Sequence, residues 1–321
     1  MKVKYFGLII QLFIIKLVVA QDFHLAQYDA NPLNLNPALT GERLGEEKGL
    51  RFNCNYRDQI GNYTNGPGAY KSIAQGLDIS LNDRFSIGQY FGNNKSVNNT
   101  FSVTNFMVSG SYKIMGDNHN QNLSVGIQMG LLNKNFNPQN FTYDSQYSAS
   151  STNGFDNTLP SGENYSRTNT FQFSTNFGLY YRKRLMKDKL TTFCGFTMNN
   201  IAKSKEIING QRGPMPIRYN FNIGAIYKLD EKLTLMPQLL FMTQNKATEL
   251  NIGTLIYYKM GNSQEPIIGV SLRSKNAYIL HVGLKVKGNT FRASYCIANN
   301  TLATYGNRGI EFSFIHISSK K

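Results

Sequence analysis

The side chains that most often carry enzyme chemistry are sparse in this 321-residue chain. Its four histidines lie in no zinc-binding or nucleophile motif, and no phosphate-binding or dinucleotide-binding glycine motif occurs. His281 is the one candidate general base, because the alternation of side chains along its segment places it on the polar face. A serine on a neighbouring strand could pair with it. Such a pair would make a hydrolase. A lone strand histidine is more often structural, so the sequence predicts a protein that is not an enzyme and holds no cofactor.

Metal and disulfide chemistry have equally little support in the sequence. The three cysteines lie far apart and form no C-x-x-C pair: Cys54, Cys194 and Cys296. A disulfide framework normally shows more cysteines and an even number of them, so all three are predicted to be ordinary strand residues. The acidic residues of the Ser- and Asn-rich stretch 137–169 are too widely spaced for a calcium loop, and this stretch is predicted to be a solvated loop.

The formal net charge of +15 suits an acidic partner, for which nucleic acid is the usual candidate. No nucleic-acid motif occurs, and the N-terminus predicts export. An apolar stretch, residues 5–19, follows two lysines, and Val18 and Ala20 stand at the two positions that a signal peptidase reads. The sequence therefore predicts a signal peptide over residues 1–20, cleavage before Gln21, and lipid, lipopolysaccharide or secreted proteins as the anionic surfaces that the chain meets.

The secondary structure of the chain is predicted from apolar side chains that alternate with small polar ones, a pattern typical of β-strands. Between Asn122 and Leu131, five large apolar residues occupy every second position, and Ser, Gly and Gln lie between them. A soluble sandwich also alternates, but its polar face usually carries many charges. The pattern predicts fourteen strands, at residues 49–59, 70–81, 85–94, 99–115, 122–136, 170–183, 189–201, 217–229, 233–244, 247–260, 266–274, 277–286, 290–298 and 309–316.

The connections between these strands differ in length in a regular way. If the first strand starts at the periplasm, the short turns all fall on the periplasmic side and the long connections 137–169, 202–216 and 299–308 all fall outside. After the first twenty residues no apolar run is long enough for a membrane helix. The predicted fold is all-β: residues 49–321 form a closed antiparallel transmembrane β-barrel of about fourteen strands in the outer membrane, since lipid does not tolerate open strand edges.

One segment is not explained by strand periodicity. Two Asn-Pro pairs, Asn31-Pro32 and Asn36-Pro37, stand five residues apart in the stretch from Gln27 to Gly41. This spacing predicts a short, compact, turn-rich N-terminal segment within residues 21–48. Judged from its turn-forming residues alone, the segment could simply cap the periplasmic mouth of the barrel.

The stretch from Gln27 to Gly41 resembles the N-terminal signature of the PorP/SprF family of type IX secretion system membrane proteins, Q-Y-x-x-N-P-L-x-L-N-P-A-x-x-G. Tyr56 to Gln59 resembles the family's Tyr-Arg-Asn-Gln block. Leu123 to Leu131 and Gly269 to Arg273 resemble its L-S-x-G-x-x-x-G-L and G-x-S-x-R strands.

The chain also departs from the family pattern at three places. Ile60 stands where the family commonly has Trp, Cys296 and Ile297 where it has Tyr-Asp, and Ile310 and Glu311 where it has His-Glu. These differences bear on the subfamily and leave the barrel intact.

The resemblance implies a noncatalytic Bacteroidota outer-membrane barrel that supports secretion or surface attachment of large proteins such as gliding adhesins. The SprF-like branch is favoured, with a core PorP-like component bound to the periplasmic ring, or a passive channel, as alternatives. Implied partners are an adhesin or its C-terminal domain, other type IX secretion components, and outer-membrane lipid and lipopolysaccharide, with no nucleic acid. The predicted partner-binding residues, which could equally brace the barrel mouth, are Tyr28, Asn31, Pro32, Asn36, Pro37, Arg57 and Gln59.

Overall fold

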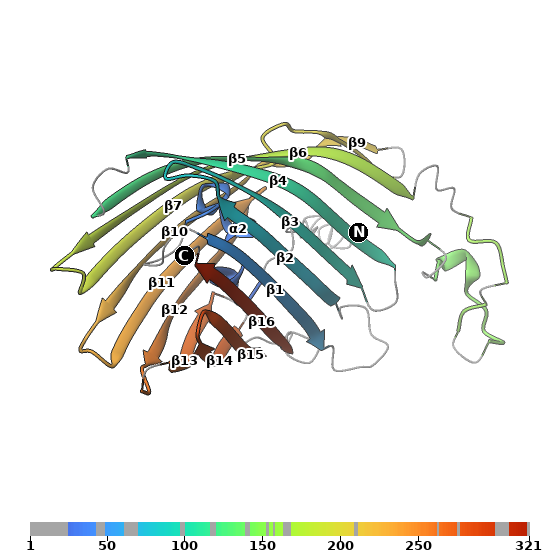
Figure 1. The fold of residues 1–321 in the computed structure, drawn as a ribbon. Coiled ribbons are helices and arrows are strands. Elements are labelled where there is room, and N and C mark those ends of the chain that lie inside the picture. Colours follow the sequence, from blue (N-terminus) through green and yellow to red (C-terminus); the bar gives the residue numbers. More distant parts are fainter. Residues whose placement is uncertain are drawn as a thin grey trace, which may run out of the picture.

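The computed structural model shows a closed β-barrel with a short segment inside it (Figure 1). The predicted signal peptide and the cleavage position before Gln21 lie outside the described residues. The structure describes residues 25–42, 49–60, 70–96, 100–115, 120–138, 142–151, 154–156, 158–162, 168–208, 211–261, 263–274, 277–298 and 308–319.

Fourteen antiparallel strands form the wall, which confirms the predicted fold class. Their bounds differ from the predicted ones by at most three residues. The wall strands are β1 (Gly49–Ile60), β2 (Tyr70–Ser80), β3 (Phe85–Ser96), β4 (Phe101–Met115), β5 (Gln121–Phe136), β6 (Asn169–Leu185), β7 (Leu190–Asn199), β10 (Arg218–Lys228), β11 (Leu233–Gln244), β12 (Ala247–Tyr258), β13 (Gln264–Arg273), β14 (Ala277–Val286), β15 (Asn289–Ala298) and β16 (Arg308–Ser319).

The barrel closes between its first and last strands. β1 pairs with β16 along its whole length, from Gly49 opposite Ser319 to Ile60 opposite Arg308. Closure leaves the wall without an unpaired edge, which is the condition for a sheet in lipid. The two remaining strands, β8 (Lys205–Ile208) and β9 (Gln211–Pro214), form a separate ribbon within the connection from β7 to β10, which the sequence predicted as a loop.

The side chains alternate between the two faces of the wall as predicted. On β5, the Ile127 side chain is 49% exposed on the outer face, whereas its neighbour Gln128 is 2% exposed on the inner face. Because the outer face is apolar on every wall strand, it suits contact with lipid tails. The three cysteines are free and lie in β1, β7 and β15, as predicted.

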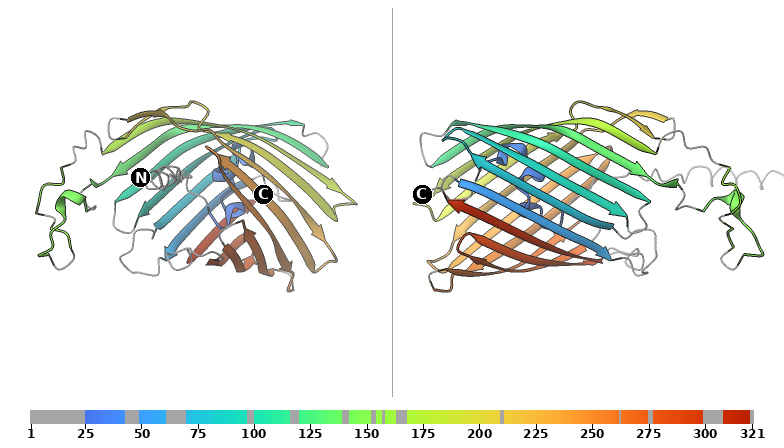
Figure 2. Two further views of the ribbon diagram at one scale, coloured as in Figure 1. Left: turned by 180° about the vertical axis from the view of Figure 1, so that it is seen from behind. Right: turned by 45° about the vertical axis from the view of Figure 1, so that its right-hand side comes forward.

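Residues 25–42, which we call the plug, lie inside the barrel (Figure 2). The plug contains three single turns of helix: η1 (Tyr28–Ala30), α2 (Pro32–Leu35) and η2 (Pro37–Leu39). The predicted turn-rich character is thus confirmed. All plug residues except Asp29 and Asn34 are buried, so the segment fills the lumen rather than covering its rim.

The two ends of the barrel differ in their connections. At the short-turn end, four or five residues join most strand pairs, as between β2 and β3 and between β10 and β11. The long connections lie at the other, long-loop end, where the segment with η4 (Asp144–Gln146) stands away from the wall (Figure 1). No helix in the described part of the chain has the length and apolar character needed to span a membrane.

Candidate functional site

The start of the plug is held by one carboxylate on the last strand. Glu311 of β16 is fully buried, and its Oε2 accepts a hydrogen bond from the backbone N–H of Ala26 at 2.7 Å. Its Oε1 accepts from the backbone N–H of Gln27 at 3.0 Å and from Nδ2 of Asn55 at 3.1 Å. Because all three donors are buried, removal of the carboxylate would leave each unsatisfied, at a cost of about 1–3 kcal/mol per group.

The middle of the plug is fixed by Asn36 and by two glycines of the wall. Asn36 caps η2, because its Oδ1 accepts from the backbone N–H of Ala38 at 2.9 Å, and its Nδ2 donates to the carbonyl of Leu179 at 2.9 Å. A Cβ at Gly126 would overlap the backbone of Pro37 and Ala38, and one at Gly178 would overlap Asn36. The wall therefore needs glycine at these points for the plug to approach.

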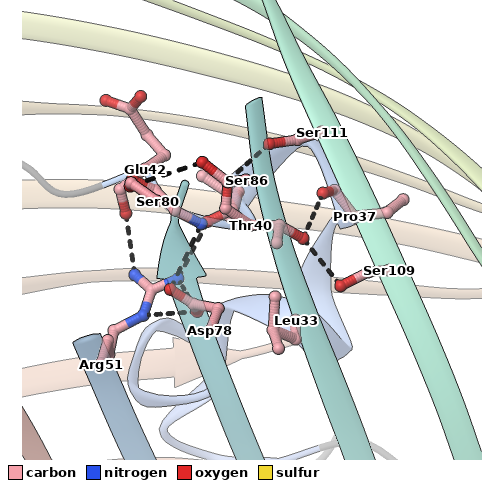
Figure 3. A network of polar contacts seen from close by, with 12 residues as sticks. Leu33, Pro37, Thr40, Glu42, Arg51, Asp78, Ser80, Ser86, Ser109 and Ser111 are labelled. Carbon is pink, nitrogen blue, oxygen red and sulfur yellow. Dashed lines mark hydrogen bonds and ion pairs between the residues drawn. The ribbon is translucent and has the colours of Figure 1, made fainter. Parts of the chain in front are cut away.

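The end of the plug is held by a buried ion pair between β1 and β2 (Figure 3). Arg51 Nη2 lies 2.6 Å from Asp78 Oδ2, and it also donates to the carbonyl of Leu39 at 2.9 Å. Arg51 Nη1 donates to the carbonyl of Glu42 at 2.8 Å, and the backbone N–H of Gly41 donates to Asp78 Oδ1 at 3.2 Å. Loss of one partner of such a pair costs about 3–5 kcal/mol, because the other charge stays buried.

Hydroxyl groups of neighbouring strands continue this network along the wall. Thr40 Oγ1 donates to Ser109 Oγ at 2.9 Å, and Ser111 Oγ donates to the carbonyl of Thr40 at 2.6 Å (Figure 3). The Glu42 carboxylate then pairs with Arg182 Nε of β6 at 2.8 Å. The plug is thus bonded to strands on several sides of the barrel.

The plug separates two cavities, which we call the inner chamber and the outer chamber. The inner chamber, about 290 Å³, reaches residues at the short-turn ends of β13 and β14, and apolar side chains dominate its lining. The outer chamber, about 410 Å³, reaches residues at the long-loop ends of β3, β6 and β11, and its most numerous lining residues are side-chain amides, with apolar side chains between them. The plug thus lies in the lumen between two separate cavities.

The predicted partner-binding residues fall into three places. Tyr28 and Pro32 line the inner chamber. Asn31, Asn36 and Pro37 are buried in the plug. The two β1 residues are apart from them: Arg57 is buried opposite Glu311, and Gln59 is half-buried near the long-loop end.

Comparison with known families decides the identity of this plugged barrel. The family described as "Type IX secretion system membrane protein PorP/SprF" matches residues 18–315. The chain belongs to the PorP/SprF family. It is accordingly an outer-membrane barrel component of type IX secretion, with other components of that system as partners. No curated protein matches the chain.

Solved structures with a similar fold include toluene transporters and a hydrocarbon channel of very different sequence. The Ralstonia pickettii toluene transporter TbuX has a TM-score of 0.53 at 10% identity, with 88% of this chain and 92% of that chain covered. The CymD monoaromatic hydrocarbon channel has a TM-score of 0.54 at 11% identity, with 94% and 95% covered. The Pseudomonas putida toluene transporter TodX has a TM-score of 0.52 at 9% identity, with 92% and 93% covered. At such identities the likeness concerns the fold alone.

Several residues that hold the PorP/SprF plug were not singled out from the sequence. The most important are Glu42, Arg51, Asp78 and Glu311. A signal was present, because the three on strands are charged residues at inward-facing positions of strands whose inner faces are mostly neutral. Ion-pairing between such residues is the expected solution to their burial.

His281, the candidate base of the hydrolase alternative, does lie beside a serine of the neighbouring strand, Ser271 of β13. Ser271 Oγ and His281 Nε2 are 3.0 Å apart, and both residues are buried. His281 Nδ1 has no hydrogen-bond partner in the described part of the chain, so the third group that orients a catalytic imidazole is not in place. The described residues also contain no group of three or more His, Cys, Asp or Glu side chains that could hold a metal ion.

Proposed function

We propose that this protein is a noncatalytic SprF-like barrel that supports secretion or surface attachment of large cell-surface proteins, such as gliding adhesins. It would do so by binding the C-terminal domain of the cargo or a component of the secretion machinery. The observation that carries the proposal is the bonded plug, since a porin needs an open polar lumen. A barrel that closes itself is better suited to binding than to passive flux.

The inner chamber is the place where we propose that the partner binds. With the short turns toward the periplasm, as outer-membrane barrels are oriented, this chamber faces the compartment that holds unexported cargo and the secretion ring. Phe193, Met236 and Tyr257 give it apolar walls in a lumen that is otherwise polar. A concave, mainly apolar site that also contains charged groups, such as Lys285 and Arg292 here, is a typical binding site.

This proposal divides the predicted partner-binding residues by role. Tyr28 and Pro32 line the inner chamber and would contact the partner. Asn36 and Pro37, which pack against the wall glycines, would brace the plug that forms the chamber's floor. Asn31 is fully buried and would have the same bracing role.

Deletion and complementation test the proposal. The deletion strain should lose one or a few large surface proteins while general type IX secretion continues. Complementation with Ile226→Trp, which fills the inner chamber, should fail to restore them. Complementation with Ile252→Trp, on the lipid-facing side of β12, should succeed and serves as the matched control.

Two other results would overturn the SprF-like proposal. Loss of all type IX secretion in the deletion strain would indicate a core PorP-like component at the periplasmic ring. A substrate-selective channel is the second candidate, favoured by the apolar inner chamber and by the fold shared with hydrocarbon channels. Normal surface display combined with reduced uptake of small apolar solutes would establish that channel instead.

A further inference from the structure

The outer chamber has a lining chemistry that the plug's anchoring does not use. It lies on the long-loop side of the plug and has a volume of about 410 Å³, within the usual range of ligand sites. The amide side chains in its lining come from the plug and from six wall strands. Six of them are Asn34, Asn94, Asn105, Gln128, Asn176 and Asn199.

Two of these amides have hydrogen-bonding atoms left over. Asn105 Oδ1, an acceptor, and Asn199 Nδ2, a donor, have no hydrogen-bond partner in the described part of the chain. Asn199 is only 4% exposed, and nearly all buried polar groups in folded proteins have a hydrogen-bond partner. An Asn199 donor without a partner is therefore unusual. Both atoms are buried beside the chamber, so each would gain a hydrogen bond if its amide turned toward a ligand there.

Two other amides of the outer chamber, Gln128 and Asn176, are already held in place. Gln128 donates to the carbonyl of Leu33 at 3.2 Å and accepts from Asn176 Nδ2 at 2.8 Å. Asn176 Oδ1 accepts from the backbone N–H of Asn200 at 3.0 Å. Side chains fixed by such a network lose little freedom when a ligand binds, which favours a preformed site.

The charged residues in the lining are Lys134 and Arg218, and no acidic side chain is among the lining residues that the structure describes. The chamber thus suits a neutral or anionic ligand. The ligand must carry groups that both donate and accept hydrogen bonds, as amides do. Hydroxyl groups have this property, and carbohydrates carry them at high density.

We propose that the outer chamber binds the end of an oligosaccharide, neutral or acidic, that enters from the cell surface. A free sugar, a lipopolysaccharide glycan and a glycan on a surface protein share this chemistry. The site is independent of the proposed role of the inner chamber, because different residues line it.

Calorimetry on the full barrel in lipid nanodiscs tests this site. The probes are maltotriose, digalacturonate, and polysaccharide released from lipopolysaccharide. Tetraethylene glycol is the control, because its oxygens accept hydrogen bonds but it has few groups that donate them. At least one sugar should bind, and tetraethylene glycol should bind at least tenfold more weakly. Binding of the lipopolysaccharide polysaccharide alone would assign the lipid glycan as the source, and binding of the short sugars would assign free sugars.

Variants connect binding to the chamber. Asn199→Leu should weaken sugar binding at least tenfold, and Asn34→Ala, on the half-buried plug residue, should weaken it several-fold without disturbing the wall. Asn53→Leu removes a buried amide that lines neither chamber and should leave binding unchanged. Absence of binding for every sugar, or equal binding by Asn34→Ala and the parent barrel, would overturn the proposal.

Discussion

The inner and outer chambers share one lumen and one plug, yet they differ in chemistry. The inner chamber has aromatic and aliphatic walls such as Tyr180 and Phe193, and the outer chamber has amides such as Asn176 and Asn199. The plug contributes to both, since Leu35 and Leu39 line the inner chamber and Asn34 lines the outer one. The comparison teaches that one short segment can divide the lumen of a barrel into two cavities of different chemistry.

The largest expected effect comes from removing the division between the chambers. Gly126→Leu places a side chain where the plug backbone now lies, and backbone atoms cannot move aside as a flexible side chain would. We expect displacement of the plug and an open-pore conductance in planar lipid bilayers, against a nearly closed parent barrel. Gly110→Leu on the neighbouring strand is the control, because the nearest atom to its added Cβ is 4.0 Å away. An unchanged conductance in Gly126→Leu would show that the plug does not close the lumen.

The second prediction compares a buried anchor with an exposed ion pair. Asp78→Asn leaves the Arg51 guanidinium buried without its carboxylate and should lower the free energy of unfolding by about 3–5 kcal/mol. Asp58→Asn breaks the exposed pair with Lys71, 3.9 Å long, and should cost at most about 1 kcal/mol. Urea unfolding in lipid vesicles measures both. Similar costs for the two variants would mean that Arg51 and Asp78 do not anchor the plug.

The third prediction compares the lipid face with the outer chamber. Ile127→Arg places a charge among lipid tails and should cost about 2–4 kcal/mol if this residue lies near the bilayer midplane. Asn34→Arg places the same group beside the polar outer chamber and should cost less than about 1 kcal/mol. Equal costs in the same unfolding assay would contradict the assignment of Ile127 to the lipid-facing side of β5.

The smallest effect is expected at a turn of the short-turn end. The pKa of Asp230 is held below its usual value of 3.8 by hydrogen bonds from the backbone N–H groups of Lys232 and Leu233. A lowered folded-state pKa stabilises the fold above the unfolded pKa, and this contribution disappears as the pH falls through the lowered value. Asp230→Ala should therefore unfold slightly earlier than the parent at pH 7. The gap should close in strongly acidic buffer, and a gap that persists there would exclude the carboxylate as its cause.

The sequence predicted the wall well because the information for each strand is local. Alternation over ten residues, as from Asn122 to Leu131, is sufficient to define a strand and its facing. The ribbon of β8 and β9 was missed, since strands of four residues are too short to show a period.

The position of the plug could not be predicted in the same way. The Asn-Pro pairs predicted a compact segment, but its place in the lumen depends on contacts between distant parts of the chain. Gln27 meets Glu311 across 284 residues of sequence, and Asn36 meets Leu179 across 143. Such pairings carry no local pattern. The requirement for glycine at positions such as Gly126 becomes apparent only once the plug is placed against the wall.

Photo-crosslinking at Leu35 in intact cells tests the central claim most directly. The Leu35 carbonyl accepts hydrogen bonds from Thr197 of β7 at 3.2 Å and from Asn220 of β10 at 3.4 Å, so this residue lies against the wall. A diazirine-bearing amino acid at position 35 should crosslink within the chain, and mass spectrometry should recover peptides of β7 or β10. Absence of any crosslink to the barrel's own strands, in the purified protein as well as in cells, would show that the segment lies outside the lumen and would contradict the account.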